Sequence, residues 1–591
     1  MTTMRVPVLI VGGGGAGLTA SMLLATYGVE SLVISAQPTT SLLPKAHLLN
    51  QRAMEVFSDV GVADAIYARS TPAANMSHTA WYLDVHGELD AGRLLHKMEC
   101  WDGGYTDPAW VAASPCRQAN LPQLRLEPLL RTRAEELNPG RVRFGHELLA
   151  LDQDADGVTA TIRDHAGGSE YQVRADYLLG CDGGRSVGRL VGVRLDGMGD
   201  VMRSVTIHMT ADLSPWLRDD DVLIRWIVHT RFAGAFSVLV PMGPERWGAR
   251  SEEWVFHMSH PPGLEALFDT DDKAVAAMRD RLGLPELDAR IHVVTRWRVE
   301  GLVAPRTRVG RVFLLGDAAH RHPPTGGLGL NSAVHDAHNL CWKLAHVLRG
   351  TAGDALLDTY HAERLPVFAR NTRRAIENAL NHLRIVEALG ISPGLPPDEC
   401  RRNVRQLWEN GPAGDAQRAR VAQAMASQSM EFKEHNVELG FRLASSAVLP
   451  DGSPEPANVD DVRVYRPDTR PGSPLPHAWV ERSGDRAPLR QIAPPSAFLL
   501  IAGEDGAPWC EAAREVGARR DVELVAVRVG HAEGDWLDPR LAFLRDRELD
   551  RTGAILVRPD RVIAWRSMSA ASDPVGALGD ALDRVLARAR S

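Results

Sequence analysis

The stretch Arg311–Leu344, which reads RVFLLGDAAHRHPPTGGLGLNSAVHDAHNLCWKL, constrains the fold more than any other part of the sequence. The apolar run Val312–Leu315 is short and sharply bounded, which predicts a buried parallel strand. The loop Pro323–Gly329 holds two prolines and three glycines, so it cannot be helical. Apolar residues then recur at helical spacing, and Asn331 or Ser332 is expected to cap that helix. This order predicts an α/β crossover that holds a ligand at the carboxyl end of its strand.

A second strand–turn–helix unit begins the chain. The apolar run Val6–Val11 predicts a buried strand, and a G-x-G-x-x-G pattern leads from it into a helix expected at Ala16–Tyr27. Its first glycine permits a tight turn, the second lets a pyrophosphate approach the backbone, and the third lets the helix pack closely on the strand. These glycines are Gly12, Gly14 and Gly17. The next strand, Ser31–Ile34, should end in an acidic residue for ribose hydroxyls, but Ser35 stands there.

Length and composition exclude several classes of protein. A chain of 591 residues is expected to form several domains, with 44% apolar and 24% charged residues as in ordinary globular proteins. A net charge of −8 and a pI near 6.2 argue against nucleic acid as the main partner. No apolar run approaches the roughly 18 residues of a membrane span, so a cytoplasmic protein is expected. The six cysteines are scattered without ligand-like spacing, which predicts reduced thiols and no structural metal.

Two further segments carry chemistry-bearing residues. Strands expected at Val158–Ile162 and Tyr177–Leu179 lead into GCDGGRSVGR, residues 180–189. The segment Pro44–Phe57 reads PKAHLLNQRAMEVF, and LPQLRLEPLL follows at residues 121–130. Together with the two glycine-rich units, these motifs resemble the single-component FAD-dependent aromatic hydroxylases, the p-hydroxybenzoate hydroxylase-like monooxygenases. The resemblance extends over essentially the whole chain and is greatest to the phenol and dichlorophenol hydroxylase branch.

The resemblance implies a set of FAD-binding residues. Asp317 is implied to bind the ribityl chain, the Pro323–Gly329 loop to lie along the isoalloxazine ring, and Asp182 to serve the same cofactor. Lys45 stands where the family usually has an arginine at the pyrophosphate, which keeps the charge but loses the bidentate fork. Arg189 is implied to assist NADPH. The full set is Gly12, Gly14, Gly15, Ala16, Gly17, Ser35, Lys45, Gln51, Gln123, Asp182, Gly183, Arg189, Gly316, Asp317, Pro324, Gly327, Gly329, Leu330 and Asn331.

His47 is the candidate catalytic residue. By the resemblance it occupies the place where phenol hydroxylases carry an aspartate that helps to ionise the substrate. An imidazole with a pKa near 6.5 is suited to that task, and a purely structural hydrogen-bonded histidine is an equally weighted alternative. Trp226, Phe236 and Pro323 are the candidate substrate contacts. The neighbouring aromatic residues Phe232, Trp247 and Trp254 are candidates for the same pocket or for ordinary core.

The predicted fold class is α/β, with a Rossmann-like FAD-binding domain, an inserted mostly β substrate domain and a C-terminal thioredoxin-like domain. Residues 1–190 form the first part of the FAD-binding domain with some substrate-domain strands, and residues 191–300 form the substrate domain. Residues 301–450 complete the FAD-binding domain and add a helical segment, and residues 451–591 form the C-terminal domain after a linker at Asp451–Asp461. That last domain contains only Cys510, so dithiol exchange is impossible there, and packing and oligomerisation are its expected roles.

The implied activity is hydroxylation of a phenol or hydroxypyridine ring with NADPH or NADH and O2 through a flavin C4a-hydroperoxide. One alternative uses the same flavin chemistry for epoxidation or Baeyer–Villiger oxidation in natural-product biosynthesis. Another is a flavin-binding scaffold without turnover. A flavin halogenase ranks last, because no W-x-W-x-I-P segment is present. The expected partners are an aromatic small molecule and a second copy of the chain. The arginine-rich composition of the chain indicates a bacterial source with a GC-rich genome.

Overall fold

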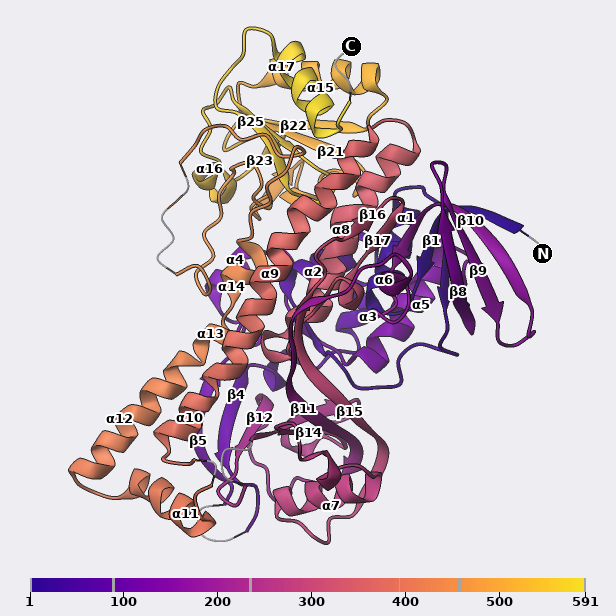
Figure 1. Cartoon of the computed structure of the whole chain (residues 1–591). Coiled ribbons are helices and arrows are strands. Elements are labelled where there is room, and N and C mark those ends of the chain that lie inside the picture. The colour runs from indigo at the N-terminus through magenta and orange to yellow at the C-terminus, as the bar shows by residue number, and fades with distance from the viewer. Residues whose placement is uncertain are drawn as a thin grey trace.

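The computed structural model describes residues 3–588 apart from 88–90, 233–235, 393, 455 and 457–459. Within this part of the chain the strands form three large sheets. Figure 1 shows the first sheet at the right, the second at the bottom and the third at the top. Long helices from residues 328–381 run between the first sheet and the C-terminal region. The predicted α/β class, with three such regions, is confirmed.

We name the first sheet the nucleotide-binding sheet, after the glycine pattern Gly12, Gly14 and Gly17 that follows one of its strands. Its strand order is β16-β17-β10-β1-β2-β7, and β17, β10, β1, β2 and β7 are parallel. The antiparallel pair β8 and β9 extends it from β10. Helices α1, α5 and α8 cover it with a shared apolar core. The bounds are β1 Thr3–Val11, β2 Ser31–Ser35, β7 Val142–Phe144, β8 His146–Gln153, β9 Val158–Asp164, β10 Glu170–Gly180, β16 Arg308–Val309, β17 Val312–Leu314, α1 Gly15–Thr26, α5 Gln123–Leu137 and α8 Leu328–Leu348.

The second sheet has the order β18-β15-β11-β14-β13-β12-β4-β5. Two of its strands, β4 and β5, come from the first hundred residues, as expected for a domain inserted in pieces. Helix α7 packs on one face through a core that includes Ile207, Leu239 and Phe256. The bounds are β4 His78–Leu83, β5 Arg93–Glu99, β11 Asp196–Ala211, β12 Val222–Val228, β13 Phe236–Gly243, β14 Glu253–His260, β15 Ala289–Val303, β18 His320–Arg321 and α7 Asp271–Leu282.

The helical segment predicted after the nucleotide-binding sheet is present. Helix α9 follows α8, and α10, α11 and α12 close one side of the second sheet with a core that includes Trp81, Ile385 and Phe432. The bounds are α9 Asp358–Asn381, α10 Leu383–Ala388, α11 Pro397–Arg405, α12 Pro412–Ser427, α13 Ser429–Phe432 and α14 His435–Leu439. The smaller elements are β3 Leu48–Leu49, β6 Ala119–Asn120, α2 Gln51–Asp59, α3 Ala63–Tyr67, α4 Pro108–Ala113 and α6 Val187–Leu190.

The C-terminal domain has the predicted thioredoxin-like order. In the sheet β20-β19-β23-β22-β21-β24-β25, β21 and β22 are parallel around α15, and the antiparallel β24 and β25 lead into α17. The bounds are β19 Trp479–Arg482, β20 Asp485–Pro488, β21 Phe498–Ala502, β22 Leu524–Gly530, β23 Trp536–Leu537, β24 Ala554–Val557, β25 Ile563–Ser567, α15 Ala507–Arg520, α16 Ala542–Asp546 and α17 Pro574–Val585. The predicted linker lies partly outside the described residues, and 451–454, 456 and 460–461 contain no helix or strand.

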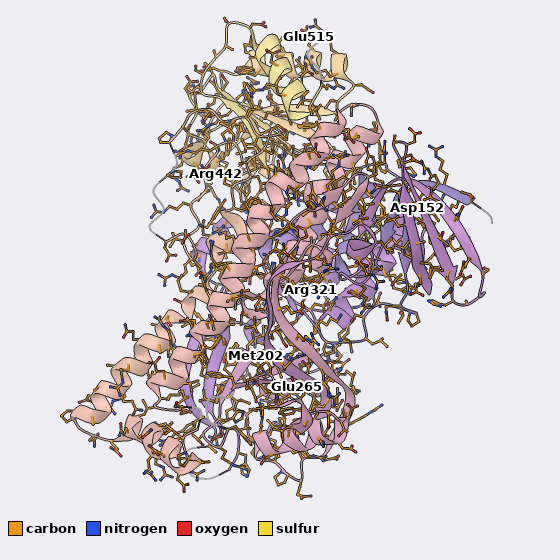
Figure 2. The ribbon with its side chains drawn as sticks, viewed as in Figure 1. Asp152, Met202, Glu265, Arg321, Arg442 and Glu515 are labelled. Atoms are coloured by element: carbon orange, nitrogen blue, oxygen red, sulfur yellow. The ribbon has the colours of Figure 1, made fainter. Side chains whose placement is uncertain are left out.

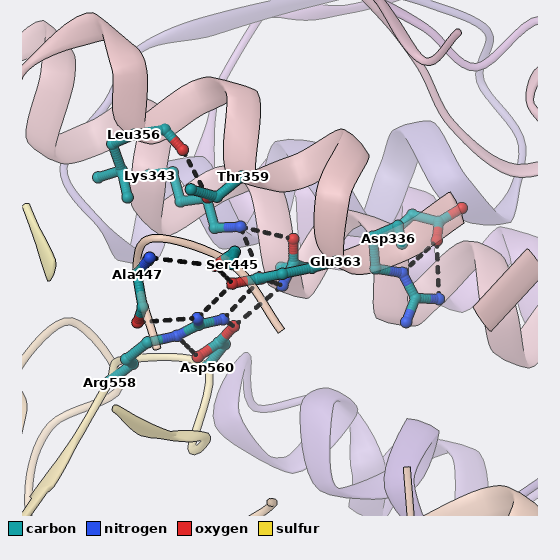
Figure 3. A network of polar contacts seen from close by, with 11 residues as sticks. Asp336, Lys343, Leu356, Thr359, Glu363, Ser445, Ala447, Arg558 and Asp560 are labelled. Carbon is teal, nitrogen blue, oxygen red and sulfur yellow. Dashed lines mark hydrogen bonds and ion pairs between the residues drawn. The ribbon is translucent and has the colours of Figure 1, made fainter. Parts of the chain in front are cut away.

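The C-terminal domain docks on α8 and α9 through buried apolar and charged contacts. Trp342 of α8 meets Phe498 edge to face at 5.8 Å, so the two regions share one core. Beside it, the Arg558 guanidinium donates to both oxygens of Glu363 (2.6 and 3.0 Å), and Lys343 Nζ donates to Glu363 at 2.8 Å (Figure 3). Asp560 also accepts from Arg558. The domain thus packs on the rest of the chain, and its predicted role in oligomerisation stays a prediction.

Removing the Glu363 charge should destabilise the protein strongly. The Glu363→Gln variant leaves two cations, Arg558 and Lys343, in a fully buried site with only Asp560 as counter-charge. Breaking a buried pair from one side costs about 3–5 kcal/mol, measurable as a loss of unfolding free energy in urea. The half-buried helical pair of Arg131 and Glu135 at i and i+4 is the control, since Glu135→Gln should cost at most about 0.5 kcal/mol. Equal losses in the two variants would contradict this account.

Candidate functional site

A cavity of about 2200 Å³ lies between the nucleotide-binding sheet and the second sheet. Its walls come from the glycine turn after β1, the loops after β10 and β17, the start of α5 and the inner face of the second sheet. In Figure 2, Arg321 lies where these two regions meet, above Met202 and Glu265 of the second-sheet region. Motifs separated by some three hundred residues in the sequence thus surround one space.

Most of the predicted site residues border this cavity. They are Gly12, Gly14, Gly15, Ala16, Ser35, Lys45, His47, Gln123, Asp182, Gly183, Arg189, Trp226, Phe236, Gly316, Asp317, Pro323, Pro324, Gly327, Gly329 and Leu330. Three predicted cofactor residues, Gly17, Gln51 and Asn331, are not part of its wall. Their surroundings give each of them a structural task instead.

Gly17 and Gly12 shape the turn from inside. A Cβ on Gly17 would lie 1.9 Å from the Gly12 carbonyl oxygen, so this glycine permits the helix–strand contact that was predicted. A Cβ on Gly12, whose φ is +121°, would lie 2.1 Å from the Cys181 oxygen of the neighbouring loop. Only glycine fits either position, and Gly12 and Gly14 present bare backbone to the cavity.

The predictions for Gln51 and Asn331 need correction. Gln51 is fully buried, and its amide donates to the carbonyl oxygens of Trp110 (2.9 Å) and Cys116 (3.1 Å), so it has no access to a cofactor. Neither Asn331 nor Ser332 caps α8. The helix begins at Leu328, because Gly327 takes a left-handed conformation (φ 65°) that turns the chain into the helix earlier. Asn331 instead fastens this first turn to the β3 segment, donating to the Leu48 carbonyl at 3.1 Å.

The two aspartates of the motifs do different work. The Asp182 carboxylate accepts from the backbone N–H groups of Gly184 (3.0 Å), Ser186 (2.6 Å) and Val187 (2.8 Å), so its first role is to hold its own loop in shape. Asp317 follows β17, is exposed to the cavity, and its carboxylate has no hydrogen-bond partner among the described residues. A free carboxylate suits the hydroxyl groups of a dinucleotide. The bare glycine backbone beside it suits the diphosphate.

Asp336 in the middle of α8 holds the Asp317 turn in place. Its carboxylate accepts from the Gly316 backbone N–H at 3.0 Å and lies 2.8 Å from His320 Nε2. Arg364 of α9 donates to the other oxygen at 2.9 Å. These partners lower the pKa of Asp336 against the effect of burial. The sequence pattern had shown only the apolar face of this helix, so Asp336 was missed.

His47 is placed by a two-residue ladder. Leu48 of β3 pairs with Asn120 of β6, which brings His47 Nδ1 within 2.5 Å of Asn120 Oδ1. The Asn120 amide nitrogen donates to Thr71 at 2.6 Å, so the amide oxygen faces the histidine and Nδ1 carries the ring proton. The lone pair of Nε2 is therefore left for the cavity. Burial lowers the pKa of His47 from its ordinary value, which keeps the ring neutral at pH 7.

His257 faces the same cavity and was missed in the sequence. It lies opposite Thr206 in the β11–β14 ladder, with its Nδ1 2.8 Å from the Thr206 hydroxyl. That hydroxyl accepts from the Trp297 indole at 2.9 Å, and when it donates its own proton to Nδ1 the ring proton of His257 sits on Nε2. Burial lowers the pKa of His257 to about 4, and a charge on His47 lowers it too. The cavity thus meets one acceptor imidazole and one donor imidazole.

Aromatic rings form the wall beyond these histidines. Trp226 stacks on His382 (centroids 3.9 Å apart) and lies parallel to Trp81 at 6.5 Å, and Phe236 meets Trp226 edge on. Of the other aromatic candidates Phe232 borders the cavity, whereas Trp254 is fully buried in the core behind the sheet. An apolar wall of this kind suits a flat aromatic ligand and excludes water from it.

One group of described side chains has a spacing that suits a metal ion, namely His208, Glu253 and His292. Glu253 Oε2 already lies 2.8 Å from His208 Nε2 and accepts from Arg125 at 2.7 Å. A guanidinium at the candidate ligand opposes a second cation there. We therefore assign no metal to this group.

The fold and the cavity define a dinucleotide-dependent protein with an aromatic wall in the same cavity. Comparison with known proteins gives the family. The FAD binding domain model matches residues 5–375, and the aromatic-ring hydroxylase C-terminal model matches residues 468–589. The chain belongs to the FAD-dependent aromatic-ring hydroxylases, and is a monooxygenase with FAD as its cofactor. No helix in the described residues combines the length and apolar character needed to span a membrane.

Individual relatives are similar over the full length. The chain is 36% identical to the 2,4-dichlorophenol 6-monooxygenase of Delftia acidovorans over 593 residues, covering 99% of each chain. The solved structure of the flavin-dependent monooxygenase PieE with FAD and substrate superimposes with a TM-score of 0.92, at 39% identity over 99% of this chain and 100% of that one. Aklavinone-11 hydroxylase with FAD and aklavinone gives a TM-score of 0.77, at 31% identity over 100% of both.

Removing the free carboxylate should weaken FAD retention. In Asp317→Ala the cofactor loses hydrogen bonds to an ionised acceptor, each worth about 1.5–3 kcal/mol. The fraction of flavin that survives dialysis, read from the visible absorbance per protein, should fall well below that of the parent. Asp317→Asn keeps an acceptor oxygen without the charge and should be intermediate. An alanine variant that retains its flavin as well as the parent would remove Asp317 from the cofactor site.

Proposed function

We propose that the protein hydroxylates a phenolic ring of an aromatic substrate larger than a single ring, with NAD(P)H as reductant. The observation that carries the proposal is the pairing of His47 and His257, one acceptor and one donor, at a cavity that also contains the glycine turns and Asp317. Its volume of about 2200 Å³ is more than twice the roughly 1000 Å³ upper size of an ordinary ligand pocket, which leaves room for a substrate beside a dinucleotide.

FAD, when bound and reduced by NAD(P)H, would activate O2, so that one oxygen atom enters the ring and the other leaves as water. The residues of the chain prepare the ring for that transfer. The aromatic wall of Trp226 and Phe236 holds it and excludes water. The exposed Arg189 and Lys45 at the same cavity provide positive charge for the phosphates of the two nucleotides.

The two imidazoles act on the phenolic oxygen. His47 Nε2 accepts the hydroxyl proton, and the resulting imidazolium keeps its Nδ1–H bond to Asn120. His257 donates its Nε2–H to the same oxygen and stabilises the negative charge that remains there. The phenolate oxygen thus gains a charged neighbour on one side and a hydrogen bond on the other, which makes the ring electron-rich enough to take up oxygen.

Phenols and natural products are the two substrate groups represented among the relatives. The Delftia acidovorans relative is named for 2,4-dichlorophenol, and one solved neighbour holds aklavinone. The size of the cavity favours the larger group. NADPH consumption with mass spectrometry of products, run over one-ring to four-ring phenols, tests this choice. Turnover of one-ring phenols alone would overturn it.

Loss of His47 should impair hydroxylation without loss of cofactor. His47→Ala removes the proton acceptor, and a lost general base typically costs on the order of 10²-fold in rate. FAD content and NADPH oxidation without substrate should stay near the parent values. The defect, measured as product formed per unit time, should shrink for phenols that are already ionised at the assay pH. An equal loss for acidic and weakly acidic phenols would make His47 a packing residue.

Loss of His257 should raise the pKa of a bound phenol. The His257 Nε2–H stabilises the phenolate and not the neutral phenol, so its removal in His257→Phe shifts the bound pKa upward. A hydrogen bond to a charged group corresponds to about one pKa unit or more. Titration of 4-nitrophenol bound to the holoenzyme, followed by its phenolate absorbance, measures the shift. The parent and the variant giving the same bound pKa would remove His257 from the reaction site.

A further inference from the structure

Arg281 differs from the other buried arginines in the described part of the chain. Each of those arginines donates to a carboxylate or to at least two backbone carbonyl oxygens. They are Arg52, Arg225, Arg364, Arg374, Arg490, Arg547, Arg558, Arg561 and Arg566. Arg281 has a relative exposure of 8% and makes one long hydrogen bond, 3.4 Å from Nη1 to the Ser237 hydroxyl. A guanidinium has five N–H donors, so most of its hydrogen-bonding capacity is unused.

The unused donors lie at the cavity. Arg281 is in the last turn of α7 and forms part of the cavity wall. Its Nε and Nη2 atoms donate to no described residue, and protein atoms do not enclose them completely. The nearby carboxylate of Asp280 is taken by Arg231, which donates to it at 2.8 Å. Burial lowers the pKa of Arg281 to about 10, so it is still protonated at neutral pH. A buried cation without a counter-charge is costly unless a ligand supplies one.

The surrounding side chains hold this guanidinium in a fixed orientation. It lies 5.6 Å from the ring centroids of both Phe232 and Phe268. The Ser237 hydroxyl that accepts from Arg281 is 2.9 Å from His229 Nε2, and His229 Nδ1 is 3.2 Å from Asp84. These contacts run from Arg281 Nη1 through Ser237 and His229 to Asp84, and they fix the position of Nη1. The other nitrogens of the guanidinium remain for a ligand in the cavity. A planar guanidinium held between aromatic rings is suited to donate two parallel hydrogen bonds to an oxyanion.

We propose that Arg281 binds an anionic oxygen group, such as a carboxylate, carried by the aromatic substrate away from the ring that is hydroxylated. The inference rests on the proposed function, because it assigns the ligand at this end of the cavity to the substrate of that reaction. The other source of such a group is a phosphate of the nicotinamide nucleotide, and the experiment below distinguishes the two.

The test is the affinity of the FAD-loaded enzyme for three phenolic acids of increasing length, each compared with its methyl ester. The probes are 4-hydroxybenzoate, 6-hydroxy-2-naphthoate and 4′-hydroxybiphenyl-4-carboxylate, titrated by the change in flavin absorbance. At one length or more, the acid should bind about tenfold to a hundredfold more tightly than its ester. In Arg281→Met this preference should disappear while ester binding stays the same. Should the methionine variant fail to fold, Arg281→Gln removes the same charge.

Arg231→Met is the matched control. It removes a positive charge from the same end of the cavity, but that guanidinium is exposed and already paired with Asp280. The control should keep the preference for acids to within about twofold, because exposed charges are screened. Survival of the preference in Arg281→Met, or its absence at every length in the parent, would overturn the proposal. So would a variant whose main defect is a raised KM for NADPH, which would assign Arg281 to the nucleotide.

The outcomes also separate this inference from the hydroxylase proposal. An enzyme that oxidises NADPH in response to neutral phenols but shows no preference for acids loses only the Arg281 assignment. Conversely, an enzyme with the acid preference but without hydroxylated product keeps the anion site and loses the proposed reaction.

Discussion

The buried carboxylates on and beside α8 are the interactions on which the rest of the structure depends. From the middle of the helix, Asp336 fixes the Gly316 backbone and thereby the turn that presents Asp317. Two turns further along, Lys343 of α8 donates to Glu363 of α9, which also binds Arg558 of the C-terminal domain. One helix therefore takes part both in the ion pairs that attach the C-terminal domain and in the contact that shapes the Asp317 turn. Figure 3 shows the first network around Glu363 and Arg558, with Asp336 apart from it. A buried ion pair gives little net stability, but it strongly penalises any arrangement that leaves a charge unpaired.

The proposed reaction site lies between two sheets, so it also depends on how their residues are positioned relative to one another. The nucleotide-binding sheet supplies bare backbone at Gly12 and Gly14, and the second sheet supplies Trp226 and His257. Both sets must keep their relative positions to within a fraction of an ångström for oxygen transfer. The β3–β6 ladder contributes to this registration, because it sets His47 against Asn120 at the boundary of the two regions.

The sequence predicted the parts of the fold that depend on local pattern. Strands such as Val6–Val11, the glycine turn and the order of the C-terminal domain follow from periodicity and turn chemistry, and the structure confirms them. It could not predict contacts that depend on pairing across the sheet. His257 acquires its tautomer from Thr206 and Trp297 on two other strands, so no local signal marks it. Gln51 was assigned to the cofactor because of its motif, a local signal. Its side chain is buried, however, and its amide donates to backbone carbonyls instead.

The choice of imidazoles over a carboxylate follows from the cost of burying charge. A carboxylate in an apolar cavity has its pKa raised by desolvation, and an ionised one must be compensated before any substrate arrives. The two histidines are neutral at rest, since burial lowers the pKa of both. In the proposed reaction, charge arises only when the phenolic proton moves to His47, and it arises as a pair whose negative member accepts from His257. The part of the cavity around the ring can therefore exclude water until proton transfer creates these two charges. The imidazoles of His47 and His257 then stabilise them. Arg281 differs from the exposed charges at the same cavity because it is buried, and in our proposal an anionic ligand offsets the cost of that burial.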